Sequence, residues 1–342
     1  MAKQGTGALS RWLGGGKRRD SLRDLRAQRA AHLVPIHQPL VLISQVNRSG
    51  GTLLSQLFAG HPACHAHPGE LLLNRPKDLW PRFDLGRSPR AWLDQLYAPH
   101  LSEYAREGYV KVPKKSRDQY ARDEITFPFA FLPGLMEDLF VEAARDARSP
   151  RQILDAYFTA FFNAWIDYQE LHGDKRWVVG FTPKLASVPE SVEHYFADYP
   201  DGRLISSIRD PHSWYVSLRG KRPDLAPSEA ITRWTRSTQA IVEHRRRFGD
   251  RVRVVSFESL LRDTPGVMRA LASWLDLPWD PVLERPTFQR LDIRANSSWR
   301  VEQTGVLDAP LERGRELDAA DRNAIDDAAG KLYDEAREII DL

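Results

Sequence analysis

The sequence has very little cysteine and no long hydrophobic run. Its 342 residues include one cysteine, Cys64, which excludes a disulfide within the chain and suits a reducing compartment. No stretch approaches the roughly 18 consecutive apolar residues that a membrane-spanning helix needs. The N-terminus lacks the apolar core of a secretory signal. The sequence therefore predicts a cytoplasmic protein without a transmembrane span.

An excess of one charge is also lacking, except at the N-terminus. The net charge of the chain is +3, whereas residues 1–30 carry eight basic and two acidic side chains. We expect residues 1–30 to be a disordered, solvated arm, with peripheral contact to an anionic membrane surface as the alternative. The rest of the chain has no basic stripe, so no nucleic-acid partner is expected. Residues 31–342 are predicted to form one domain.

Short apolar runs alternate with helical periodicity from residue 39 onward. This alternation predicts an α/β, P-loop-like, three-layer domain, in which helices flank a central, mostly parallel sheet of four to five strands. A lid-like insertion is expected over about 70–150, with a helix near 89–107. The predicted strands are 39–45, 176–183, 203–210 and 251–260, and the other predicted helices are 151–173, 189–198, 211–219, 227–247, 265–277 and 318–337.

The segment NRSGGTLL, residues 47–54, has the composition of a phosphate-binding loop. It follows a predicted strand and opens a helix, so its backbone N–H groups converge where the helix dipole favours an anion. Gly50 and Gly51 would let the backbone approach that anion, and Arg48, Ser49 and Thr52 add side-chain donors. The lysine of the nucleoside-triphosphate loop G-x-x-x-x-G-K-[ST] is missing, which disfavours an ATPase or a kinase.

A second anion-binding pattern lies in RLISSIRDPHSWYVS, residues 203–217. Arg209 ends a predicted strand, and Ser217 follows eight residues later on a helix that begins with proline. About two helical turns can bring this hydroxyl and this guanidinium to one anion. The two patterns together predict two anion-binding corners at the ends of neighbouring strands.

Four segments resemble, in their order and spacing, motifs of the PAPS-dependent sulfotransferases. They are NRSGGTLLSQL, HPACHAHPGELL, RLISSIRDPHSWYVS and VVSFESLLRDTPGVMRALASWLDLPWDP. The resemblance is to the bacterial P-R-S-G-T-T-L-L branch, which includes relatives of tyrosylprotein and carbohydrate sulfotransferases, and it covers about 39–285. It implies transfer of a sulfuryl group from 3′-phosphoadenosine-5′-phosphosulfate (PAPS) to an acceptor hydroxyl by in-line displacement.

The resemblance also implies the roles of individual residues. Glu70 matches the glutamate that serves as general base, and Arg48 would stabilise charge on the departing phosphate. His65 and His67 are the alternative bases. No metal is needed, because fixed donors already hold the departing group. The implied PAPS-binding residues are Arg48, Ser49, Gly50, Gly51, Thr52 and Leu53 for the 5′-phosphosulfate, Arg209 and Ser217 for the 3′-phosphate, and Asn296 and Ser297 as a segment that closes over the nucleotide.

Two positions depart from the family pattern. Phe181 stands where the family often has a lysine that stabilises the transferring group, and Lys184, or Lys114 or Lys115 from the insertion, would have to replace it. Phe257 stands where the family has a tyrosine, so only apolar packing against the nucleotide is expected there.

Two other functions are compatible with the same patterns. One is a P-loop kinase or NTPase, which would bind ATP with Mg²⁺. The other is a non-catalytic module of the same fold that binds anionic partners. The acceptor class stays open between a glycan, a lipid, a peptide and a small molecule.

Overall fold

The structure is a computed structural model that describes residues 15–96, 121–122, 125–126, 129–293, 305–306 and 309–342. Its centre is a five-stranded sheet in which every pair of neighbouring strands is parallel. The strands lie in the order β2-β5-β1-β6-β7. Their bounds are β1 Leu40–Ile43, β2 Cys64–Glu70, β5 Trp177–Phe181, β6 Arg203–Ile208 and β7 Val252–Ser256. The predicted α/β class and parallel sheet are confirmed.

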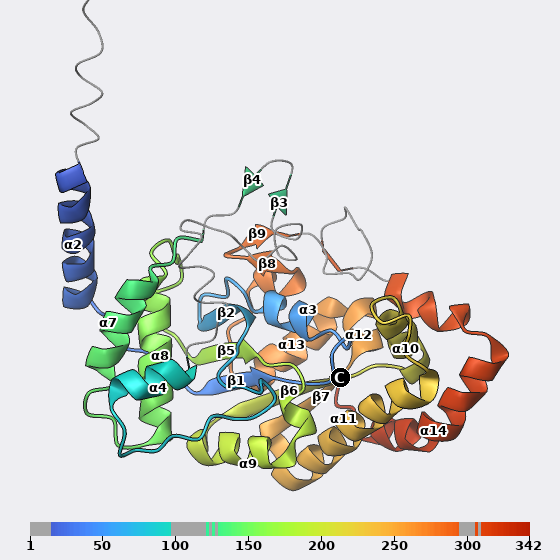
Figure 1. Cartoon of the computed structure of the whole chain (residues 1–342). Coiled ribbons are helices and arrows are strands. Elements are labelled where there is room, and N and C mark those ends of the chain that lie inside the picture. Colours follow the sequence, from blue (N-terminus) through green and yellow to red (C-terminus); the bar gives the residue numbers. More distant parts are fainter. Residues whose placement is uncertain (1–14, 97–120, 123–124, 127–128, 294–304, 307–308) are drawn as a thin grey trace, which may run out of the picture.

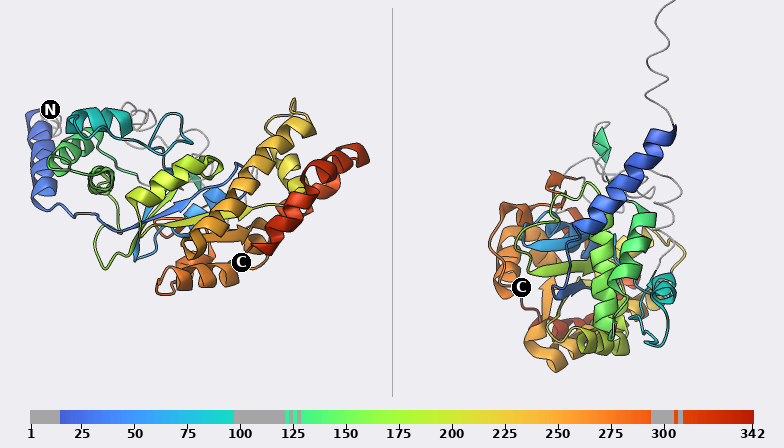
Figure 2. Two further views of the ribbon diagram at one scale, coloured as in Figure 1. Left: turned by 90° about the horizontal axis from the view of Figure 1, so that it is seen from below. Right: turned by 90° about the vertical axis from the view of Figure 1, so that its left-hand side faces the viewer.

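Helices cover both faces of this sheet (Figures 1 and 2), because alternate residues of each buried strand point to opposite faces. Leu40 and Leu42 of β1 join a core shared with α8 (Pro150–Ala164), α9 (Pro189–Asp198) and α11 (Pro227–Phe248). Val41 and Ile43 join a second core, shared with α3 (Gly51–Leu57) and α13 (Thr264–Trp274). The domain therefore has the three layers that the sequence predicts.

The remaining elements surround these layers. In the described part of the chain they are α2 Gly15–Ala31, α4 Pro89–Leu96, α7 Pro133–Ala143, α10 Pro211–Arg219, α12 Phe257–Arg262 and α14 Ala319–Glu338, the 3₁₀ helices η1 Leu185–Ser187, η2 Gly249–Arg251, η3 Pro281–Glu284 and η4 Ala309–Glu316, and the short hairpins formed by β3 Ala121–Arg122 with β4 Ile125–Thr126 and by β8 Thr287–Phe288 with β9 Leu291–Asp292. None of the described helices has the length and apolarity to span a membrane.

The edge strand β2 is an element that the sequence patterns missed. Its sequence, CHAHPGE, has no β-branched residue and contains proline and glycine, both of which are rare inside strands. The strand is nevertheless paired with β5, with His65 opposite Val178. The register then shifts between Ala66 and Glu70, which sets Glu70 opposite Phe181. His65 and His67 thus lie on a strand, and the strand pairing positions the Glu70 carboxylate.

Two predicted elements end well before their predicted C-terminal boundaries, whereas the others that the structure describes in full differ by only a few residues. The helix predicted over 151–173 ends at Ala164, because Trp165 forms a β-bridge with Phe131 and Ile166 N donates to Ala130 O at 2.7 Å. The strand predicted over 251–260 ends at Ser256, whose side chain accepts from Ser259 N and caps α12. In both places a tertiary or capping contact overrides the periodic pattern.

The structure also describes parts of the basic arm and of the insertion. Residues 15–31 of the arm form α2, and Arg29 anchors this helix by donating to Ile166 O at 2.7 Å. Within the insertion, Trp92 of α4 and Leu135 of α7 are buried in the core beside α8. Residues 1–14 and 97–120 lie outside the described residues, so the lid stays a prediction.

Candidate active site

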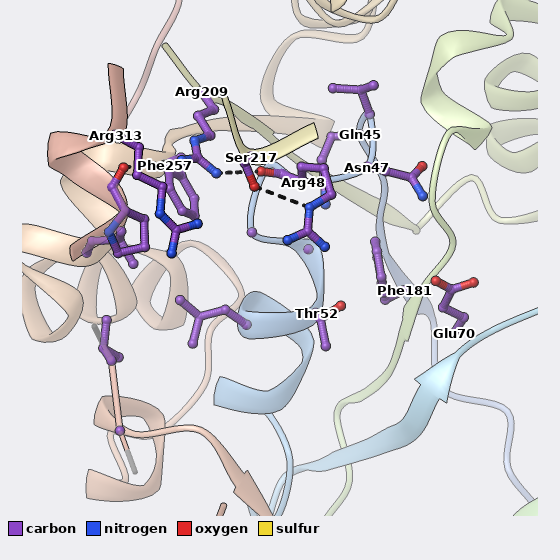
Figure 3. A pocket seen from close by; sticks show the side chains of 18 residues that line it. Gln45, Asn47, Arg48, Thr52, Glu70, Phe181, Arg209, Ser217, Phe257 and Arg313 are labelled. Carbon is purple, nitrogen blue, oxygen red and sulfur yellow. Dashed lines mark hydrogen bonds between the residues drawn. The ribbon is translucent and has the colours of Figure 1, made fainter. Parts of the chain in front are cut away.

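A pocket lies where the five parallel strands end. Each strand end contributes to it: Glu70 ends β2 and Phe181 ends β5. Arg209 and Phe257 directly follow β6 and β7, and Gln45 is the second residue after β1. The pocket is lined by Gln45, Val46, Asn47, Arg48, Gly50, Gly51, Thr52, Leu53, Glu70, Phe181, Arg209, Ser217, Phe257, Leu261, Gly305, Val306, Pro310 and Arg313 (Figure 3). Ligands of open α/β sheets bind at this edge.

The loop after β1 has its carbonyl groups turned toward protein donors. Gln45 O accepts from Lys184 N, Asn47 O from Trp214 Nε1, Arg48 O from Arg209 Nη1, and Ser49 O from Ser207 Oγ. By contrast, no backbone N–H of residues 47–50, 52 or 53 donates to another described residue. A run of N–H groups that the protein leaves unused, at the start of α3, is an arrangement that receives an anion.

The two glycines of this loop are required by packing. Gly50 has φ +88°, and a Cβ there would lie 2.7 Å from Phe257 Cδ2. A Cβ on Gly51 would collide with Gln45 Nε2 and with the Phe181 ring. The glycines therefore let Phe257, Gln45 and Phe181 close against the loop, which is an additional reason for their presence beside close approach of an anion.

The side chains of the two predicted anion sites meet in this one pocket. Arg48 Nε donates to Ser217 Oγ at 3.3 Å, and Arg209 Nη1 donates to Arg48 O at 3.0 Å (Figure 3). Arg209 is also held by Ser213 Oγ at 3.0 Å, by Pro310 O at 3.2 Å, and by the Phe257 ring, whose centroid lies 4.5 Å from the guanidinium carbon. The guanidinium is thus fixed from four directions before any ligand binds.

Positive charge is concentrated on this side of the pocket. Burial, together with repulsion from Arg313 and Arg48, lowers the pKa of Arg209 to about 10 against the attraction of Glu258. Burial and Arg313 likewise lower the pKa of Arg48, and burial lowers the pKa of Arg313. All three groups remain protonated at neutral pH. Among the described residues, neither Arg48 nor Arg209 forms an ion pair with a carboxylate, so the cluster favours an anionic ligand.

Glu70 lies on the other side of the pocket. Figure 3 shows it beyond the Phe181 ring, on the same side of the loop as Asn47, whereas Arg209 and Arg313 lie on the opposite side. Its carboxylate forms an ion pair with Lys77 Nζ at 2.9 Å, and both side chains are about two-fifths exposed, at 42% and 38%. A carboxylate that faces an anion site across a pocket can accept a proton from a group bound between them.

The other predicted site residues lie in different places. Ser49 is buried beneath the loop rather than in the pocket wall, and its Oγ has no partner among the described residues. Lys184 is exposed and does not line the pocket, although its N–H holds the Gln45 carbonyl. The predicted residues Asn296 and Ser297, with Lys114 and Lys115, lie outside the described residues.

The two alternative bases do not reach the pocket. His65 packs against Phe162 with ring centroids 5.1 Å apart, and burial together with Lys175 lowers its pKa to about 3. His67 packs against Phe161 at 4.7 Å. Neither lines the pocket, and a histidine with a pKa near 3 is a poor proton acceptor at neutral pH. Of the three predicted bases, only Glu70 lines the pocket.

Three polar pocket residues were not identified from the sequence. Asn47 opens the quoted segment and Gln45 lies two residues before it, so their position near Arg48 was a usable signal. Arg313 lies on η4, which packs beside α10, and no motif marks it. Within the described ranges, no group of three histidine, cysteine, aspartate or glutamate side chains could hold a metal ion.

Comparison with known proteins gives a consistent assignment. The model of the "Sulfotransferase family" matches residues 39–281. The sulfotransferase domain of the Synechococcus PCC 7002 olefin synthase is similar in structure, with a TM-score of 0.54, 20% identity, and coverage of 88% of this chain and 96% of that one. The sulfotransferase domain of the curacin biosynthetic pathway follows, with a TM-score of 0.46, 16% identity, and coverage of 86% and 98%. Comparison with curated protein sequences gave no match.

Proposed function

Because the chain belongs to the sulfotransferase family, we propose that it transfers a sulfuryl group from PAPS to an acceptor hydroxyl by in-line displacement, with Glu70 as general base. Membership makes the chain an enzyme of a PAPS-binding family, which disfavours the kinase and non-catalytic alternatives. The observation that carries the proposed mechanism is a single pocket with three guanidinium groups on one side and the Glu70 carboxylate on the other.

The residues of the pocket fit PAPS. Its donor set consists of Arg48, Arg209, Arg313, the hydroxyl of Ser217 and the unused N–H groups of the loop, and such donors suit phosphate and sulfate oxygens. We assign the 5′-phosphosulfate to residues 48–53 and the 3′-phosphate to Arg209, Ser217 and Arg313. Ser49 contributes its backbone N–H in this assignment, because its side chain is buried.

PAPS, when bound, supplies an activated sulfuryl group. As the acceptor oxygen bonds to sulfur, Glu70 takes the hydroxyl proton, and the bond from sulfur to the 5′-phosphate oxygen breaks with its electron pair left on the phosphate. Arg48 and the loop N–H groups stabilise this growing negative charge, since they are already fixed in place. No step in this scheme requires a metal ion.

The Phe181 ring between Arg48 and Glu70 keeps that part of the pocket apolar (Figure 3). An apolar wall beside the reacting groups strengthens the electrostatic interactions that act there. Lys184 is exposed, so its proposed contact with the transferring group would need its side chain to turn inward.

The acceptor is a hydroxyl-bearing molecule, and we propose a cytoplasmic location for the reaction.

Replacement of Glu70 by glutamine tests the mechanism. The variant keeps the shape of the side chain but cannot accept a proton, so we expect 3′,5′-ADP to bind as in the wild type while transfer falls by about 100-fold or more. Glu190→Gln, at an exposed position in the first turn of α9, is the matched control. Unchanged transfer in Glu70→Gln would remove Glu70 from its role, and a wild-type protein that does not bind 3′,5′-ADP would contradict the donor assignment.

A further inference from the structure

The proposed mechanism assigns no role to the side chain of Asn47. Its backbone is fixed, because Asn47 O accepts from the buried Trp214 Nε1 at 2.8 Å. Its carboxamide, however, makes no hydrogen bond with any described residue, and its Oδ1 is buried. The carboxamide nitrogen, which donates to no described residue, is therefore available to donate to a ligand in the pocket.

The position of the carboxamide narrows the choice of ligand. Asn47 lines the same pocket as Arg48 and Glu70, and Figure 3 shows its side chain on the Glu70 side of the loop, away from Arg209 and Arg313. In the proposed function, the group that lies between the 5′-phosphate and the base is the sulfuryl group. The backbone of Asn47 belongs to the loop around that phosphate, and its side chain is short.

We infer that the Asn47 carboxamide contacts the sulfuryl group of PAPS and so distinguishes the loaded donor from the spent product, 3′,5′-ADP. The inference rests on the proposed function. The amide nitrogen donates to a sulfuryl oxygen. Asn47 thereby supplies a neutral hydrogen-bond donor near Phe181, which stands where the family often has a lysine and which has no donor of its own. Binding of 3′,5′-ADP does not involve this contact.

Paired affinities for two ligands test this inference without a known acceptor. We would measure the Kd of PAPS and of 3′,5′-ADP by calorimetry for the wild type, Asn47→Asp and Asn47→Ala. Aspartate has the same shape, but its carboxylate repels the sulfuryl oxygens most and the 5′-phosphate less, so PAPS should bind about 10-fold or more weakly and 3′,5′-ADP should be weakened by a clearly smaller factor. Alanine should weaken PAPS binding by about 3- to 10-fold, again selectively.

A control and two contrary outcomes complete the test. Thr52→Ala, in the same loop, should weaken both ligands to a similar extent. Equal weakening of both ligands by Asn47→Ala would show that Asn47 only shapes the loop, and no weakening of either would show that it contacts neither; both results overturn the inference. If the wild type binds neither ligand, the proposed function itself fails, which is a distinct result.

Discussion

Arg48 and Ser217 are joined by a hydrogen bond of 3.3 Å, although they belong to two different anion-binding patterns of the sequence. Arg48 comes from the loop after β1, and Ser217 comes from α10. The two patterns therefore meet in one pocket, where their side chains are directly linked.

This link predicts that substitutions at the two positions are not independent. Arg48→Ala and Ser217→Ala should each weaken 3′,5′-ADP binding, and the double variant should differ from the sum by about 0.5–3 kcal/mol, as for residues that share a hydrogen bond. Calorimetry on the four proteins of the cycle measures this coupling. In a second cycle, Thr232→Ala at an exposed position of α11 should be additive with Arg48→Ala. Additivity in both cycles would mean that the hydrogen bond between Arg48 and Ser217 contributes no coupling free energy to 3′,5′-ADP binding.

Gly50 should not tolerate even one methyl group. Gly50→Ala forces an alanine to φ +88° and sets its Cβ 2.7 Å from Phe257, so we expect a loss of about 1–3 kcal/mol in stability and weaker 3′,5′-ADP binding. Gly330→Ala is the matched control, because its Cβ would meet nothing within 4 Å inside α14. It should raise stability by about 0.5–1 kcal/mol. Chemical denaturation measures both changes, and a neutral Gly50→Ala would contradict the packing argument.

Arg313 should contribute to nucleotide binding although no motif marks it. It lines the pocket, whereas Arg315 on the same 3₁₀ helix is 83% exposed and pairs with Glu312 at 2.6 Å. Removing a charged donor from a phosphate costs about 1.5–3 kcal/mol, so Arg313→Ala should raise the Kd of 3′,5′-ADP by about 10- to 100-fold. Arg315→Ala should leave it within about 2-fold. Equal effects would show that only overall charge matters.

His212 should make stability depend on pH. Its Nδ1 lies 3.4 Å from Asp210 Oδ2 and its Nε2 lies 2.9 Å from Asp326 Oδ1, which connects α10 with α14. The hydrogen bond to Asp210 and the two carboxylates raise the pKa of His212 against the effect of burial and of Arg322. Because the folded pKa is raised, this stabilisation is fully present below the unfolded value near 6.5 and is lost as the pH rises through the folded pKa.

The corresponding experiment compares two histidine variants. His212→Gln should lose about 0.5–1 kcal/mol at pH 5.5 and much less at pH 8.5, as measured by urea denaturation. His172→Gln, at an exposed position, should show no such dependence. An equal loss at both pH values would mean that the charge of His212 does not stabilise the fold.

Much of the fold could be predicted from the sequence because its signals are local. The apolar run of β1 and the proline at the start of α10 each mark their element without reference to the rest of the chain. The strand β2 carries no such signal, since its pairing with β5 depends on tertiary contact. The early end of α8 at Ala164 has the same origin.

The candidate site divides in the same way. Residues 48–53 and Arg209 could be predicted, because they lie at strand ends and carry the donors that phosphate requires. Arg313 and the unengaged carboxamide of Asn47 could not, since pocket lining and missing partners are properties of the folded chain. Ser49 shows the converse limit: its sequence position is right for the loop, but its hydroxyl faces inward.

The arginine cluster has a consequence for turnover. Arg48, Arg209 and Arg313 hold the 3′- and 5′-phosphates in the proposed function, and both phosphates remain after the sulfuryl group has left. The same charges that bind PAPS would therefore also hold the product, 3′,5′-ADP. We expect release of 3′,5′-ADP to limit the turnover rate. Moderate salt screens these charges. It should therefore raise kcat at saturating PAPS and lower kcat/KM for PAPS.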